Sequence, residues 1–152
     1  MANTQAMCTS FMGQLLTATH DFTPSTGDTF KGALYLASAT VNASTTAYSS
    51  TGEVTGTNYS AGGVTVTNGT APASTNASAT AGTAYWTPSA SITYTNVTLS
   101  TAFDAVLIYN STKTNKAVSV HTFGSQTVTA GTFTLTMPTN DTSTALIRLA
   151  TT

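Results

Sequence analysis

The sequence contains very few charged residues. Only 6% of its 152 residues are Asp, Glu, Lys or Arg, against about 25% in an ordinary globular domain. Four scattered basic residues cannot form a phosphate-neutralising stripe, so we expect no nucleic-acid partner. The net charge of −1 leaves little repulsion between neighbouring molecules, which favours a protein that works within an assembly. The alternative is a monomer with a polar, threonine-coated surface.

Cysteines, long apolar runs and a secretion signal are scarce or missing as well. Cys8 is the single cysteine, which excludes an intrachain disulfide and predicts a free, buried thiol. No apolar run reaches the roughly 18 residues of a membrane span, so no membrane partner is expected. Residues 1–19 lack Lys and Arg, and polar residues interrupt their apolar ones. We therefore expect the protein to remain in the cytoplasm where it is made until it is assembled.

Residues suited to catalysis are few and dispersed. His20 lies beside Asp21 at the end of a predicted helix, and His121 lies in a predicted strand, so structural roles are favoured for both. The five acids show no paired spacing, and two His and one Cys far apart do not resemble a zinc site. The sequence therefore predicts no catalytic residue, no metal and no cofactor.

Threonine is abundant, with 37 copies in the chain. Its branched Cβ suits a pleated strand, and its hydroxyl keeps an outward face wettable without charge. After residue 28 the pattern indicates eight or nine short strands separated by polar turns, with a bulge near Asn96. This pattern predicts one domain over 1–152, an antiparallel β-sandwich of jelly-roll or similar Greek-key topology. The expected strands are 30–39, 53–59, 63–67, 84–87, 91–99, 103–109, 117–123, 127–137 and 144–150.

Two further segments stand apart from this pattern. Residues 5–19 predict one amphipathic helix, capped by Thr4 or Asn3. Residues 68–83 have low complexity and almost no large side chains, which predicts an exposed loop. The apolar stripe of the helix is formed by Met7, Cys8, Phe11, Met12, Leu15 and Leu16.

Several strings resemble small virion proteins of tailed bacteriophages. The resemblance covers most of the chain except 68–83, and it rests on strand and turn signatures that carry no functional residue. It implies a virion structural protein. The strings are MANTQAMCTSF (1–11), GDTFKGALYLASATVNASTTAY (27–48), GEVTGTNYSAGGVTVT (52–67), LIYNSTKTNKAVSV (107–120) and TVTAGTFTLTMPTND (127–141).

Small size, low charge and a β-sandwich suit a capsid decoration or cement protein. Such a protein sits on the outer shell, bridges neighbouring major capsid protein subunits, and often forms dimers or trimers. A tail, neck or fibre component of the same particle is an alternative. A carbohydrate- or cell-surface-binding module is another, and it would need exposed aromatics from among Tyr48, Tyr59, Tyr85 and Trp86. An enzyme is the least favoured reading.

The expected partner interface combines the N-terminal segment with the low-complexity loop. For the helical residues, packing against the chain's own sheet is an equally good alternative. The expected interface residues are Phe11, Met12, Leu15, Asn68, Pro72 and Asn76.

Overall fold

The computed structural model describes residues 2–75 and 81–151, and its fold is mostly β. All strand pairs are antiparallel, and one short helix lies near the N-terminus. The predicted fold class, two antiparallel sheets with an N-terminal helix, is confirmed. The elements are β1 (Ala6–Met7), α1 (Thr9–Leu16), β2 (Phe30–Leu36), β3 (Val64–Val66), β4 (Ala73–Ser74), β5 (Thr83–Trp86), β6 (Ile92–Asn110), β7 (Lys116–Leu135) and β8 (Ile147–Ala150).

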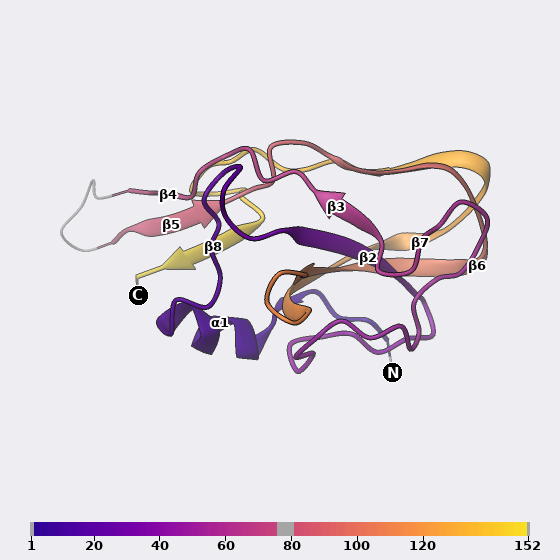
Figure 1. The fold of residues 1–152 in the computed structure, drawn as a ribbon, viewed down its shortest axis with the longest axis horizontal. Coiled ribbons are helices and arrows are strands. Elements are labelled where there is room, and N and C mark those ends of the chain that lie inside the picture. Colours follow the sequence, from indigo (N-terminus) through magenta and orange to yellow (C-terminus); the bar gives the residue numbers. More distant parts are fainter. Residues whose placement is uncertain (1, 76–80, 152) are drawn as a thin grey trace.

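The strands form two sheets of unequal size (Figure 1). The larger has the order β1-β7-β6-β2-β3, and the smaller has the order β4-β5-β8. Strand β2 lies inside the larger sheet, between β6 and β3, and is buried over most of its length, in agreement with its nearly continuous apolar sequence. The helix α1 lies beside the smaller sheet.

Strands β6 and β7 form one long hairpin where the sequence predicts four shorter strands. Register shifts along the pair, between Tyr94 and Val97 and again up to Phe103, let the two strands bend without separating. Asn96 lies in the first shift with a positive φ of 51°, which confirms the predicted bulge. The short Ser- and Thr-containing segments between the predicted strands therefore stay in strand conformation and are exposed, because each long strand continues through them.

The predicted helix over 5–19 is too long at both ends. Ala6 and Met7 pair with β7 as strand β1, and Cys8 occupies the N-cap without a side-chain cap hydrogen bond. Asn3 is not a cap; its amide bonds Leu36 O at 2.9 Å and Asp104 Oδ1 at 2.6 Å. Pairing with an edge strand satisfies this segment's backbone, so the helix starts only where that pairing ends.

Two other predicted segments also differ from the structure. Residues 53–59 form only isolated bridges, such as Tyr35 with Glu53, and do not form a strand. The expected loop 68–83 contains β4 and the first residue of β5, because a short hairpin satisfies its backbone groups; residues 76–80 lie outside the described part. The described loop residues are mostly exposed, as predicted.

A buried carboxylate explains why 53–59 departs from strand geometry. Glu53 accepts hydrogen bonds from Tyr48 Oη at 2.6 Å, Tyr59 Oη at 2.8 Å and Gly62 N at 2.7 Å. A buried charge must be hydrogen-bonded to be tolerated. The chain around Glu53 therefore folds to bring these donors together.

Candidate interaction surface

An apolar groove lies between α1 and the smaller sheet. Its volume is about 110 Å³. The ring of Phe22 stacks on Phe30 with centroids 4.4 Å apart and meets Trp86 edge-on at 4.8 Å, which fixes the inner wall. The groove is lined by Phe11, Leu15, Phe22, Pro72, Ala84, Tyr85, Trp86, Ile147 and Leu149.

Three large apolar side chains on the same two elements are left in solvent. Met12 and Leu16 on α1 are 45% and 90% exposed, and Leu149 on β8 is 41% exposed. These three are the large hydrophobic residues that are exposed among residues 2–75 and 81–151. We call the groove together with Met12, Leu16 and Leu149 the apolar surface. Such clusters on a soluble protein often mark an interaction site.

The structure brings together four of the six predicted interface residues. Phe11, Leu15 and Pro72 line the groove, and Met12 lies beside it on α1. Phe11 is only 1% exposed, so it forms the floor and packs with the chain's own core. The alternative of internal packing therefore holds for Phe11, whereas Met12 faces solvent.

Asn68 has a structural role. Its Nδ2 donates to Phe22 O at 3.1 Å, and its Oδ1 accepts from Trp86 Nε1 at 3.1 Å. These bonds hold the segment after β3 against the inner wall of the groove. Asn76 lies outside the described residues.

The sequence did not predict Leu149 as part of this surface. Ile147 and Leu149 are two residues apart on β8, so both lie on the face of the strand that lines the groove. Ile147 is buried and Leu149 is not, because Leu149 lies nearer the end of a short strand. No periodicity in the sequence distinguishes these two residues.

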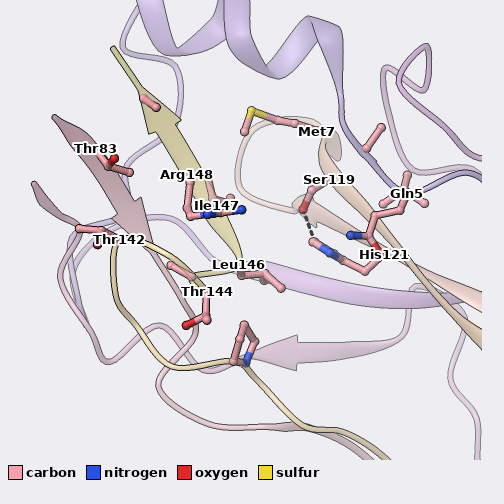
Figure 2. Close-up of a pocket in the computed structure, with 15 residues that line it drawn as sticks. Gln5, Met7, Thr83, Ser119, His121, Thr142, Thr144, Leu146, Ile147 and Arg148 are labelled. Atoms are coloured by element: carbon pink, nitrogen blue, oxygen red, sulfur yellow. Dashed lines mark hydrogen bonds between the residues drawn. The ribbon is translucent and has the colours of Figure 1, made fainter. Parts of the chain in front are cut away.

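A second hollow, of about 630 Å³, lies on the other side of β8, between that strand and β1 with β7 (Figure 2). We call it the cleft. Ser119 Oγ and His121 Nε2 lie 2.9 Å apart on its β7 side. Burial lowers the pKa of His121 to about 4, so the imidazole is neutral at pH 7 and its Nε2 can accept a hydrogen bond from the Ser119 hydroxyl.

The Ser119–His121 pair supplies only part of what nucleophilic catalysis needs. Ser119 is 2% exposed, which leaves its hydroxyl little contact with a ligand in the cleft. No carboxylate is among the described residues that line the cleft, so no acid orients the imidazole. The described ranges also contain no group of three or more His, Cys, Asp or Glu able to hold a metal.

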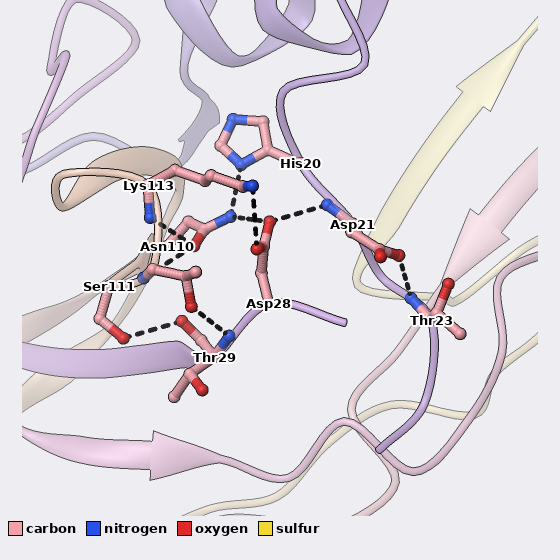
Figure 3. A network of polar contacts seen from close by, with 9 residues as sticks. His20, Asp21, Thr23, Asp28, Thr29, Asn110, Ser111 and Lys113 are labelled. Atoms are coloured by element: carbon pink, nitrogen blue, oxygen red, sulfur yellow. Dashed lines mark hydrogen bonds and ion pairs between the residues drawn. The ribbon is translucent and has the colours of Figure 1, made fainter. Parts of the chain in front are cut away.

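His20 is held in a buried polar network between α1 and the sheet (Figure 3). Its Nδ1 accepts from Asn110 Nδ2 at 2.9 Å, so Nε2 carries the proton and donates to Gln14 Oε1 at 2.7 Å. Asn110 also donates to Asp28, which pairs with Lys113 at 3.5 Å. Burial lowers the pKa of His20, although Asp28 opposes that effect. The network connects α1 to the turn beside β2 and β6.

The aromatic residues that a sugar site would need are engaged elsewhere. Trp86 is buried, and the hydroxyls of Tyr48 and Tyr59 bind Glu53. Tyr85 lines the apolar groove and is partly buried. These four residues therefore do not form an exposed stacking platform.

Comparisons with protein-family models, curated proteins and solved structures give no significant match for this chain. Among the described residues, no helix has the length and apolar character to cross a membrane.

Proposed function

We propose that this chain is a structural protein of a tailed-phage virion, a decoration or cement protein that bridges neighbouring major capsid protein subunits on the outer shell. The observation that carries the proposal is the apolar surface on α1 and β8, which lies on a chain with only 6% charged residues. The resemblance of its strand and turn strings to small phage virion proteins supports the same role.

The occupant that fits this surface is an apolar ridge on a shell subunit. Leu16 is 90% exposed, and burying such a side chain contributes about 1.5–3 kcal/mol. One copy would bind modestly through a few such side chains. Many copies that each join two or more subunits reinforce a shell by multivalency, and this requires no chemistry from the protein.

Copy number in purified particles tests the role. A cement protein should appear at a ratio near one to one with the major capsid protein by gel densitometry. Six or twelve copies per particle would instead indicate the neck or tail and would contradict the shell assignment. Absence from the particles would contradict any virion role.

Substitution of Leu16 tests the surface. Leu16→Asp should reduce retention of the protein on particles by at least about tenfold, because it removes at least about 1.4 kcal/mol of apolar burial per contact. Thr127→Asp, an exposed change on β7 outside the apolar surface, is the matched control and should be retained normally. Equal retention of both variants would rule out the apolar surface as the attachment site.

A further inference from the structure

The outermost strands of both sheets line the cleft. Gln5, Ala6 and Met7 line one side, and Arg148 and Ala150 of β8 line another. Strand β1 is the outermost strand of the larger sheet, and β8 is the outermost strand of the smaller sheet. Exposed strand edges are ready templates for pairing with another chain.

The register shows which backbone groups of β8 face away from its neighbour. Thr151 N donates to Gly82 O at 3.0 Å, and the same register pairs Ala84 with Leu149. Hydrogen-bonded pairs alternate along an antiparallel ladder. The N–H and C=O groups of Arg148 and Ala150 therefore point away from β5, towards the free edge that borders the cleft.

The same argument applies to β1. Cys8 N donates to Val118 O at 3.0 Å, and the register pairs Met7 with Ser119. Cys8 thus belongs to a hydrogen-bonded pair, and Met7, one residue earlier, turns its N–H and C=O away from β7. Residues 41–43, however, lie against this N-terminal segment: Thr4 N donates to Val41 O at 3.0 Å, and Thr9 N donates to Ala43 O at 2.8 Å on the side away from β7. The open strand edge at the cleft is therefore that of β8.

The cleft has a charge preference. Arg148 is the charged residue among the described residues that line it, and Figure 2 shows its side chain directed into the space between β8 and β7. Arg148 is exposed, and the one ion pair found in the described ranges joins Lys113 and Asp28, so its guanidinium has no acidic partner there. Arg binds a carboxylate through paired, charge-assisted hydrogen bonds.

We propose that the cleft binds an extended acidic segment of a partner polypeptide as a strand added to the free edge of β8, with a carboxylate of that segment against Arg148. The added strand would pair with the backbone groups of Arg148 and Ala150 that face away from β5. Main-chain pairing supplies affinity in this mode of recognition, and side-chain contacts supply specificity. This site is separate from the apolar surface and does not depend on the proposed virion role.

The test uses fluorescein-labelled peptides of about seven residues, a usual strand length. They alternate Thr and Val and carry Glu, Gln or Lys at the centre. Fluorescence polarisation with the full chain should show the Glu peptide binding at least about tenfold more tightly than the Lys peptide. Failure of the Glu peptide to bind at about 1 mM, or equal binding of all three peptides, would overturn the proposal.

Two variants identify the site within the fold. Arg148→Gln should abolish the preference for Glu over Gln, whereas Thr127→Asp lowers the net charge by the same single unit outside the cleft and should keep it. Ala150→Pro removes an N–H that does not bond β5, so it should block peptide pairing while leaving the unfolding midpoint unchanged. Normal peptide binding by folded Ala150→Pro protein would overturn strand addition.

Discussion

Mild acid should destabilise this protein through His121. The imidazole is partly buried beside the cleft, with Nε2 2.9 Å from Ser119 Oγ. Burial lowers its pKa from 6.5 to about 4. No carboxylate among the described cleft residues offsets the cost of a positive charge there. Protonation of His121 is therefore harder in the folded chain than in the unfolded one.

The sign and size of the effect follow from linkage. The folded pKa lies below the unfolded value, so the unfolded state binds more protons between about pH 6.5 and pH 4. The contribution of His121 is fully present above about pH 6.5 and falls as the pH drops through this window. At pH 5, about 1.5 pH units below the unfolded pKa, the free energy of unfolding is lower by about 2 kcal/mol.

Urea unfolding at pH 7 and pH 5 measures this directly for wild type and His121→Gln. Glutamine keeps a polar side chain but does not titrate. The loss of unfolding free energy between the two pH values should be about 2 kcal/mol smaller in the variant. His20, whose pKa is also lowered, is present in both proteins and cancels. An identical pH dependence in the two proteins would refute this account of His121.

Three further predictions concern buried polar and small residues. Asn110→Ala should cost about 3 kcal/mol or more in urea unfolding, because several buried polar groups lose their partner; a loss below about 1 kcal/mol would contradict this. Gly63→Ala should be similarly severe, since φ is +69° and a Cβ would overlap Gly32 O. Gly13→Ala on α1 is its counterpart: the added Cβ meets nothing, so this change should stabilise the protein by up to about 1 kcal/mol. Cys8 is buried and burial raises its thiol pKa to about 11, so a thiol reagent should modify it only after unfolding, and rapid labelling of native protein would count against this placement.

The apolar surface and the cleft are the two sites to which we assign partner binding. The apolar surface contains Leu16 and Leu149 beside a preformed groove, and the cleft contains Arg148 and the edge of β8 that faces away from β5. They lie on different sides of β8 and can be tested separately. Loss of function at one therefore does not predict loss at the other.

Much of the architecture could be predicted from local pattern. The continuous apolar run from Phe30 identifies a central strand, and the phase change near Asn96 identifies a bulge. A continuous apolar run indicates a strand covered on both faces, and a change of phase in the alternation indicates a bulge; both signals depend only on neighbouring residues. The capping residue and apolar stripe of 5–19 predicted the bounds of the helix less well, because Ala6 and Met7 pair with β7 and form β-sheet hydrogen bonds instead.

The sequence by itself therefore determined the β-rich class, the scarcity of charge and the apolar character of the segment around Phe11, since these depend on composition and short-range periodicity. Only the tertiary structure decided that Leu16 stays in solvent while Phe11, five residues earlier, is buried. It also decided that β1, β7 and β8 line one cleft, with Arg148 directed into it. Exposure and edge pairing depend on which distant segments pack against a residue, and no local pattern contains that information.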